Sequence, residues 1–544
     1  MSAAAVARSS LPGRAEAISR YTPAWLLTAL LGVVYLILAP QSPDLAAASY
    51  RSHLFSQVGF SLWDNSWYGG HHLLAYSLLA PALGALIGPQ LLAALSMTLA
   101  TALFSLAIAG RVAPSAARAA GLWFAVGASV ALLSSRVPFD LGLAIGLGAL
   151  VLAQRRRAFA AALLAVLASL ASPIAGAFLA MAMLAWALVG PRRLLPGVLC
   201  VLALAPVAFL SLAFPEGGSQ PFVASAFWPA LAAVIVVGLV IGAEQRVLRI
   251  GVLLYALVLL GSFFLATAVG GNADRLGALA AGPIAACGLL GTPQPWRRWT
   301  LLALIVPLTY WQANAPVTDY VSTLSNPATQ ASYYAPLLGE LPRLGIGYGR
   351  RPARIEVVPT SVHWEARYVA PATMIARGWE RQLDRYRNGL FYSSAPLTPQ
   401  RYRRWLGAQS ISYVALPDAT LDYSGTAERS LLGAAAVTGP GGFLREVWHA
   451  RHWRLFAVLA PQPLAVRGSL TEVGTQSFTL HVPRPGRYTV RVHYTPYWAI
   501  ARGSGCVSQA PGDWTGLLAR AAGPMHVVID FSPGRIFARG ARCS

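Results

Sequence analysis

Long apolar runs recur through the first three hundred residues and constrain the fold more than any other feature of the sequence. Eleven such runs can be marked, at residues 23–40, 91–110, 119–135, 140–153, 158–172, 174–190, 194–214, 224–243, 250–268, 276–292 and 299–314. Hydrophobic residues make up 56% of the chain and charged residues only 11%. A soluble core does not need so many apolar runs of roughly membrane-spanning length. The sequence therefore predicts a polytopic α-helical membrane bundle over residues 1–314.

The arginines between these runs predict the orientation of the bundle. With the N-terminus in the cytoplasm, short outer loops hold only Arg51, Arg136 and Arg275, whereas fourteen arginines fall on the cytoplasmic side. These are Arg8, Arg14, Arg20, Arg111, Arg118, Arg155, Arg156, Arg157, Arg192, Arg193, Arg246, Arg249, Arg297 and Arg298. Cytoplasmic loops of membrane proteins are enriched in basic residues. We therefore expect a multi-pass protein of the cell membrane with a cytoplasmic N-terminus and an extracytoplasmic region after about residue 315.

Two further expectations depend on this topology. The count holds only if the stretch 73–88 does not cross the membrane, and its short, Pro-interrupted and Gly-rich sequence favours a surface or re-entrant helix. The net charge of +22 would suggest nucleic acid in a soluble protein, but here many arginines lie in short loops as topology signals. We expect membrane lipids, and no nucleic acid, among the partners.

The large first outer loop, residues 41–90, holds the densest group of polar and aromatic side chains. Within it, SLWDNSWYGGHH precedes an apolar stretch, and its Trp63, Trp67 and Tyr68 suit an interfacial aromatic belt. A belt does not explain the acidic and imidazole groups, which gain nothing by approaching lipid. The unexplained groups of the loop are Asp44, Asp64, His71 and His72. The loop is therefore the first candidate for a functional site.

The order of these features resembles the GT-C superfamily of membrane glycosyltransferases. The first span is followed by SPDLAAASYRSHLF, then by a His-led surface helix ending in LIG, then by a second span that returns to a basic loop. The stretch LWDNSWYGGHH with the later YSLLAP is more particularly similar to the actinobacterial arabinofuranosyltransferase-like and YfhO-like branches. The resemblance implies that an acidic residue of the first outer loop is the catalytic carboxylate, which maps to Asp44. It also implies a sugar donor carried on a polyprenyl phosphate.

The chemistry of such a transfer assigns roles to the outer charges. A carboxylate that accepts the proton of the acceptor hydroxyl is worth roughly a hundred- to ten-thousandfold in rate, and Asp44 is the candidate. The leaving phosphate needs cations, preferably guanidinium groups, and the candidates are Arg51, Arg136 and Arg275. Arg51 lies two helical turns after Asp44 and is expected on the same helix face. The alternative for Arg136 and Arg275 is snorkelling or pairing with a neighbouring aspartate.

Further donor-binding candidates in this loop are Asp64, Tyr68, His71 and His72. A helix expected to begin near His71, just after a glycine pair, would offer free backbone N–H groups to a phosphate. Adjacent histidines on a helix point in different directions and cannot chelate one metal, so no metal ligands are assigned. Asp44 and Asp64 could supply oxygen ligands to a divalent cation. No other cofactor is expected.

The composition changes after residue 314, and two extracytoplasmic regions are predicted. Residues 315–460 mix strand patterns (RIEVVP, SISYVALP, WRLFAVLAP) with a helical segment, ATMIARGWERQLDRYRN, which is typical of an α/β unit. Residues 461–544 predict a β-sandwich resembling carbohydrate-binding modules, with a hairpin over SFTLHVPRPGRYTVRVHY. Its aromatic candidates for sugar stacking, with core packing as the alternative, are Tyr497, Trp498 and Trp514.

Cysteine positions agree with this topology. Cys200 and Cys287 fall inside predicted spans, where a thiol behaves as a small apolar group, and we expect Cys506 and Cys543 to form a disulfide in an oxidising compartment. The sequence contains no GxGxxG, Walker, GxSxG or Cys-x-x-Cys motif.

We expect a GT-C-type glycosyltransferase that moves a sugar, such as arabinofuranose or mannose, from a polyprenyl-phosphate donor to a cell-envelope glycan or glycolipid on the outer face. A single base and no second nucleophile predict inversion. The alternatives are a transporter or flippase of lipid-linked sugars and a non-catalytic membrane scaffold that binds glycan. A transporter would show repeated halves and charges near the membrane midplane, and the sequence has no such internal repeat.

Overall fold

The computed structural model describes residues 22–190, 192–290, 295–349, 351–540 and 542–543. Each of the eleven apolar runs forms a helix: α2 (Thr22–Leu38), α5 (Pro89–Ile108), α6 (Pro114–Ala131), α7 (Val137–Gln154), α8 (Ala158–Ala171), α9 (Pro173–Val189), α10 (Leu194–Ala213), α11 (Ala224–Val240), α12 (Arg246–Phe264), α13 (Asp274–Leu289) and α14 (Pro295–Thr323). Arg8, Arg14, Arg20 and the last two residues of the run 276–292 lie outside the described residues.

Five of these helices are long and apolar enough to cross a membrane: α5, α6 with its 3-10 extension η1 (Leu132–Ser134), α7, α10 and α12. Length and composition give a sixth span if α2 and α3 (Pro43–Val58) are counted as one, and an 81° bend separates these two helices. Helices α8, α9 and α11 are apolar but shorter. Crossing by all eleven helices stays a prediction.

Small residues allow the helices of the bundle to pack closely. Ala93 and Ala100 on α5 and Ala128 on α6 are fully buried. A Cβ atom on Gly142 of α7 would lie 2.8 Å from the Cβ atoms of Ala175 and Ser172, so only glycine permits this approach to α9. Close contact through alanine and glycine is typical of helix packing in membranes, where there is no hydrophobic drive between helices.

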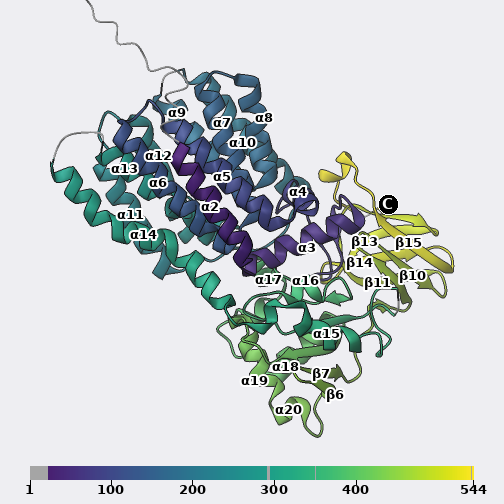
Figure 1. Ribbon diagram of the computed structural model, residues 1–544. Coiled ribbons are helices and arrows are strands. Elements are labelled where there is room, and N and C mark those ends of the chain that lie inside the picture. Colours follow the sequence, from purple (N-terminus) through teal and green to yellow (C-terminus); the bar gives the residue numbers. More distant parts are fainter. Residues whose placement is uncertain (1–21, 191, 291–294, 350, 541, 544) are drawn as a thin grey trace, which may run out of the picture.

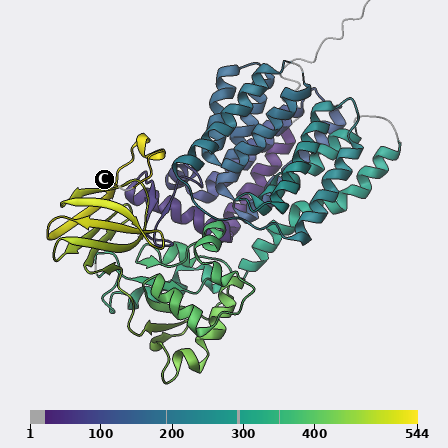
Figure 2. The same ribbon diagram turned by 180° about the vertical axis from the view of Figure 1, so that it is seen from behind.

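Helix α14 carries the chain out of the bundle. It extends nine residues beyond the predicted end of the apolar run at residue 314, with Pro307 and Pro316 inside it. Figures 1 and 2 show the bundle in purple to teal, with the green region after α14 and the yellow C-terminal region gathered at one end of it. Helix α3 projects from the bundle at the same end.

The region after α14 contains a five-stranded mixed sheet in the order β4-β3-β5-β7-β6. Its strands are β3 (Arg354–Val357), β4 (Met374–Ile375), β5 (Ile411–Pro417), β6 (Leu444–Ala450) and β7 (Trp453–Val458). β3 pairs in parallel with β4 and β5, whereas β7 pairs antiparallel with β5 and β6. Its helices are η3 (Pro327–Thr329), α15 (Ala331–Glu340), α16 (Glu365–Tyr368), α17 (Arg381–Arg387), η4 (Gly389–Phe391), α18 (Pro399–Ala408), η5 (Tyr423–Gly425), α19 (Thr426–Leu432) and α20 (Ala435–Thr438).

One helix predicted in this region is only half correct. Of residues 372–388, only Arg381–Arg387 form a helix, α17, while Met374 and Ile375 form strand β4. Both strand residues are buried, and the N–H of Ile375 donates to Ser66 O at 2.9 Å instead of to a helical carbonyl. Alternating charges are compatible with a helix, but contacts with distant segments decided the conformation of the first half.

The C-terminal region consists of two four-stranded antiparallel sheets, β12-β15-β10-β9 and β13-β14-β11-β8. The strands are β8 (Ala465–Val466), β9 (Ser469–Gly474), β10 (Ser477–Val482), β11 (Gly486–His493), β12 (Trp498–Arg502), β13 (Gly505–Ala510), β14 (Trp514–Ala519) and β15 (Gly523–Ile529), followed by η6 (Pro533–Ile536). Cys506 and Cys543 form a disulfide. Buried apolar residues of both sheets form one core, which includes Phe478, Val490 and Val527.

The hairpin predicted over residues 477–494 is wrong in its pairing. Strands β10 and β11 occur where the alternation places them, but β10 pairs with β9 and β15 and β11 pairs with β8 and β14. The turn between them therefore crosses from one sheet to the other. Alternation identifies which side chains face a core, and Phe478, Leu480 and Tyr488 are indeed buried, but it does not identify the partner strand.

Residues 41–90, predicted to be the first outer loop, contain a two-stranded ribbon after α3 instead of a long surface helix. Strand β1 (Trp63–Asp64) pairs antiparallel with β2 (His71–His72), and the following helix α4 (Ala80–Ile87) begins only at Ala80. The expected helix over 73–88 is thus reduced to eight residues, and none begins near His71. Gly69 and Gly70 have φ values of 77° and 113°, so they reverse the chain into a strand and do not start a helix.

Candidate functional site

The capped start of α3 positions Asp44. Ser42 is the N-cap, and its hydroxyl oxygen accepts the N–H of Leu45 and donates to Ser134 O at 2.7 Å. Pro43 occupies the first turn, where a missing N–H costs nothing. Asp44 follows in the same turn, where the helix dipole favours a negative charge. Its side chain is 30% exposed, so the carboxylate can be reached from solvent.

Arg136 lies between two carboxylates. Its Nε is 3.2 Å from Oδ2 of Asp44, and its Nη2 is 3.6 Å from Oδ2 of Asp319 on α14. Ser135, with φ of 52°, turns the chain between η1 and α7, and the hydroxyl of Ser134 donates to Asp319. The side chains of Arg136 and Asp319 are 25% and 32% exposed. The structure therefore brings the predicted base and one predicted phosphate ligand into direct contact, together with an aspartate that the sequence did not single out.

A second arginine and a tyrosine adjoin this group. The guanidinium of Arg275, at the start of α13, lies 5.6 Å from the centre of the Phe139 ring. Tyr76 lies in the loop before α4, where burial and the negative charge of Asp44 raise the pKa of its hydroxyl to about 12 against the opposing effects of Arg51 and Arg275. Asp140, in the first turn of α7, is buried with one carboxylate oxygen that has no hydrogen-bond partner in the described part of the chain.

We call Asp44, Tyr76, Arg136, Arg275 and Asp319 the outer charge cluster, after the orientation that the sequence predicts. It joins the N-terminus of α3, the loop before α4, the turn before α7, the start of α13 and the extension of α14. Helix α3 contacts η1 and α7, and α14 contacts η1, and α3 projects from one end of the bundle (Figure 1). The cluster combines a solvent-accessible carboxylate with two guanidinium groups, which can accept a proton and hold an anion.

Arg51 has a different partner from the one expected. Helix α3 does contain both Asp44 and Arg51, but Nη2 of Arg51 donates to Oε2 of Glu380 at 2.8 Å. Its guanidinium also lies 4.1 Å from the centre of the Tyr76 ring. The ion pair is almost buried, with 4% and 16% of the two side chains exposed. Arg51 therefore joins α3 to the α/β region beside the outer charge cluster.

The remaining candidates of the loop are buried. Asp64 accepts hydrogen bonds from the Tyr50 hydroxyl and the Ser66 N–H, both at 2.8 Å. His71 is fully buried and stacks on Trp67 with ring centres 5.6 Å apart. These contacts leave no surface of Asp64 or His71 open to a donor in this conformation.

His72 and Tyr68 contact segments from other parts of the chain. Nδ1 of His72 lies 2.8 Å from Oε1 of Glu216, and Nε2 lies 3.0 Å from the Thr495 hydroxyl. The Tyr68 hydroxyl accepts the N–H of Glu380 at 2.9 Å. The space beside the glycine pair is also occupied, since a Cβ on Gly70 would lie 2.4 Å from the Trp63 ring. The expected anion site at a helix start near His71 is therefore wrong.

The three aromatic candidates for sugar stacking belong to the core. Tyr497 and Trp498 are fully buried and Trp514 is 8% exposed. Trp498 packs against Phe478 and Trp63, and Trp514 stacks on His493 with ring centres 4.2 Å apart. Because a buried ring presents no face to a sugar, core packing accounts for all three.

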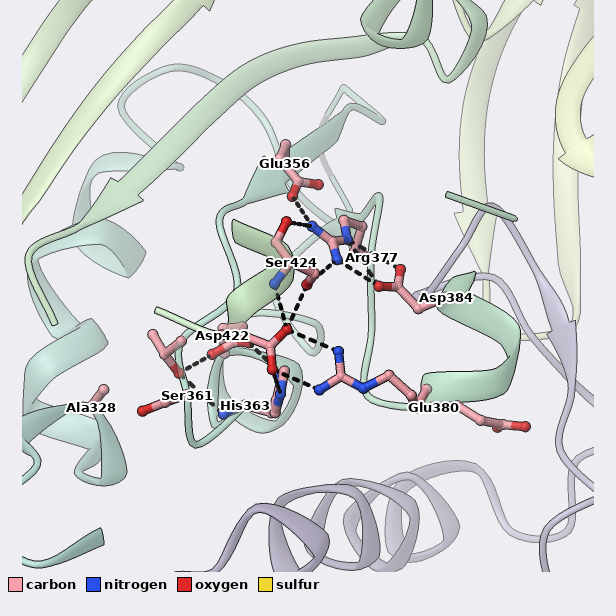
Figure 3. A network of polar contacts seen from close by, with 12 residues as sticks. Ala328, Glu356, Ser361, His363, Arg377, Glu380, Asp384, Asp422 and Ser424 are labelled. Atoms are coloured by element: carbon pink, nitrogen blue, oxygen red, sulfur yellow. Dashed lines mark hydrogen bonds and ion pairs between the residues drawn. The ribbon is translucent and has the colours of Figure 1, made fainter. Parts of the chain in front are cut away.

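Sequence reasoning missed a buried polar network in the α/β region, which Figure 3 shows. His363, Arg377 and Asp422 follow the carboxyl ends of the parallel strands β3, β4 and β5, where loop residues of an α/β sheet converge. Nη2 of Arg377 lies 2.6 Å from Oδ2 of Asp384 and 2.6 Å from the Ser424 hydroxyl. These residues are widely spaced in the sequence, so only the three parallel strands could have indicated them.

Ion pairing explains the electrostatics of this network. Burial alone would raise the pKa of Asp422, but Arg381 and His363 hold it well below its usual range. Arg377 likewise lowers the pKa of Asp384 against the effect of burial. Burial raises the pKa of both Glu356 and Glu428, and both carboxylate oxygens of Glu356 and one of Glu428 have no hydrogen-bond partner in the described chain. With His363, Arg377 and Asp384 almost completely buried, the network is arranged to hold the segment 363–384 in place.

The described residues contain no group of three or more His, Cys, Asp or Glu side chains suited to hold a metal ion. Asp44 and Asp64, the candidate pair of cation ligands, have separate partners in Arg136 and in Tyr50 with Ser66.

Comparison with known proteins identifies no family. No protein-family model and no curated protein matches the sequence. Two cryo-EM structures of a mutant arabinofuranosyltransferase AftD from Mycobacteria resemble the chain. The first is 16% identical in sequence with a TM-score of 0.45, and the match covers 88% of this chain and 44% of that chain. The second is 14% identical with a TM-score of 0.39, and the match covers 98% of this chain and 60% of that chain. The chain thus spans about half the length of these proteins.

Proposed function

We propose that the protein is an integral membrane glycosyltransferase that moves a sugar, such as arabinofuranose or mannose, from a polyprenyl-phosphate donor to a cell-envelope glycan or glycolipid on the outer face. The observation that supports it is the contact between Asp44 and Arg136 in the outer charge cluster, 3.2 Å apart and partly exposed. A proton acceptor and an anion ligand then lie side by side, as transfer from a lipid phosphate to a hydroxyl requires.

In the proposed reaction, the acceptor hydroxyl oxygen attacks the anomeric carbon of the donor sugar. Its proton passes to the Asp44 carboxylate as the bond between the anomeric carbon and the phosphate oxygen breaks. The bonding electrons leave with the polyprenyl phosphate, whose growing negative charge Arg136 and Arg275 stabilise. A single displacement of this kind inverts the anomeric configuration.

Arg136 links the two carboxylates of the cluster, because its guanidinium contacts both Asp44 and Asp319. A donor phosphate competes for the same guanidinium, so its arrival weakens the contact to Asp44 and frees that carboxylate to accept a proton. Asp319 keeps the hydroxyl of Ser134 as a partner when Arg136 moves.

Asp44→Asn tests the proposal because asparagine keeps the size and hydrogen bonding of aspartate but cannot act as the base. We expect transfer from a radiolabelled polyprenyl-phosphate sugar to fall by at least a hundredfold. The matched control is Asp530→Asn, which removes an exposed carboxylate of the β-sandwich region and should leave transfer unchanged. Substantial turnover by Asp44→Asn would exclude Asp44 as the base.

Arg136→Gln tests the phosphate ligand separately. Loss of one charge-assisted contact should weaken donor binding about 10- to 100-fold, whereas acceptor binding should change little. Arg118→Gln removes an exposed arginine near the start of α6 and serves as the control. Equal effects of the two variants on the KM for the donor would show that Arg136 does not hold the phosphate.

A further inference from the structure

A large cavity lies inside the bundle, away from the outer charge cluster. Its volume is about 830 Å³, and its walls come from α5, α6, α7, α9, α11, α12 and α13. Typical lining residues are Phe104, Leu147, Met181, Val252 and Ile284. Protein interiors rarely leave voids larger than a water molecule, and ligand sites usually have volumes of about 300–1,000 Å³. The cavity therefore has the size and the lining of a site for an apolar ligand.

The cavity is elongated along the helices. Its lining runs from Leu143 to Gln154 on α7 and from Arg246 to Tyr255 on α12. At 1.5 Å per residue these segments measure roughly 16 Å and 13 Å. Such a length is about half of the roughly 30 Å hydrocarbon core of a bilayer. It matches the depth that the tail of a lipid reaches within a single leaflet.

The two ends of the cavity differ. The charged lining residues are Arg111, which follows the end of α5, and Glu244 and Arg246, which adjoin the start of α12, and all three are exposed. Toward the other end, Phe178 and Tyr255 are buried and meet edge to face, with ring centres 6.4 Å apart. A ligand can therefore present an anionic group only at the end that carries the arginines.

The basic end lies opposite the outer charge cluster. Helix α5 starts beside α4, near α3, and its 20 residues span roughly 30 Å before the chain reaches Arg111. Additional positive charge lies nearby, since Arg155 contributes, after burial, to a lowered pKa of Arg111. The charged lining residues alone, two arginines and one glutamate, carry a net charge of +1, and Arg155 adds to it, so this end attracts an anionic group.

We propose that this cavity binds one anionic phospholipid of the surrounding bilayer, with its tail between α7, α9 and α12 and its phosphate between Arg111 and Arg246. The lipid tail gains no hydrophobic free energy by leaving the bilayer, so packing against the lining and the contacts of its phosphate determine binding. The site selects lipids by charge. The proposal is independent of the transferase activity, because binding requires neither a sugar donor nor Asp44.

The full-length chain, purified in detergent, provides the test by native mass spectrometry with phosphatidylglycerol or phosphatidylcholine. We expect one phosphatidylglycerol to be retained per chain, with an affinity at least about tenfold above that of phosphatidylcholine. The double variant Arg111→Gln, Arg246→Gln should lose this preference. The control Arg192→Gln, Arg193→Gln removes two other exposed arginines that do not line the cavity and should keep it.

A third variant tests the cavity itself. Ala280→Phe places a ring in the space lined by α13 and should displace the lipid without changing the charges at the mouth. Elution of each variant as a monodisperse species in size-exclusion chromatography, with a wild-type thermal transition, shows that it is folded. Equal retention of both lipids by the wild-type chain, equal losses in the two arginine double variants, or full lipid retention by folded Ala280→Phe would each overturn the proposal.

Discussion

Gly70 is the position in the first outer loop where a single methyl group should have the largest effect. Its φ of 113° lies in a region that side chains other than glycine rarely adopt. An added Cβ would lie 2.4 Å from Cζ2 and 2.8 Å from Nε1 of Trp63. Trp63 cannot easily move away, because it is 1% exposed, packs against Trp498 and donates a hydrogen bond to Asn65 at 2.7 Å.

Gly70→Ala should therefore destabilise the protein through two separate effects. Forcing alanine to a positive φ costs about 1–3 kcal/mol. Crowding the Trp63 ring adds about 1–3 kcal/mol, the usual cost of overpacking a core. We expect a total loss of about 4 kcal/mol in the free energy of unfolding, as the sum of these two ranges near their centres.

Gly88→Ala is the matched control for this loss. Gly88 also has a positive φ, 86°, but no atom lies within 4 Å of the position that an added methyl group would take. Thermal unfolding of both variants in the same detergent should give a clearly lower Tm for Gly70→Ala, because only that variant carries the overpacking cost. If Gly70→Ala is as stable as Gly88→Ala, the Trp63 contact does not constrain the loop and the reasoning is wrong.

Three further outcomes are expected. Burial raises the pKa of Glu428 above its ordinary value of 4.5. The protonated carboxyl group therefore contributes to stability below about pH 4.5, and this contribution is lost as the pH rises through the raised pKa. Glu428→Gln should flatten the resulting decline of Tm with rising pH. Arg51→Gln leaves Glu380 without its almost buried partner and should cost about 3 kcal/mol of stability, with partial recovery in the double variant with Glu380→Gln, in thermal unfolding. In intact cells, an impermeant thiol reagent should label Ser394→Cys, in the α/β region, but not Ser115→Cys, at the start of α6; the reverse pattern would refute the orientation.

Much of the secondary structure was predictable because it depends on local patterns. Every apolar run forms a helix, and Ser42 with Pro43 signals the start of α3. Alternating residues identified β3, β5 and β7. The pairing of β10 and β11 was not predictable, because both strands bury alternate residues in one shared core whichever sheet they join.

The candidate site was predictable only in part. Asp44, Arg136 and Arg275 stood out as outer charges beside apolar runs, where a charge needs a specific reason. Asp319 did not stand out in the sequence, because its contact with Arg136 requires that α14 continue past residue 314 and pack beside η1. His71 was assigned to a helix because the sequence after it is apolar, but pairing with Asp64 across a ribbon decided its conformation.

The contacts of the first outer loop also have a consequence for the order of folding during synthesis. His72 is 423 residues ahead of Thr495, with which it shares a hydrogen bond. At typical translation rates of 5–20 residues per second, roughly 20 to 80 seconds separate the appearance of these two residues from the ribosome. During that interval the ribbon of β1 and β2 lacks the C-terminal residues that later pack against it, such as Trp498 beside Trp63. Completion of the loop is therefore a late event that waits for nearly the whole chain, and the nascent protein depends on its surroundings to keep this segment from aggregating.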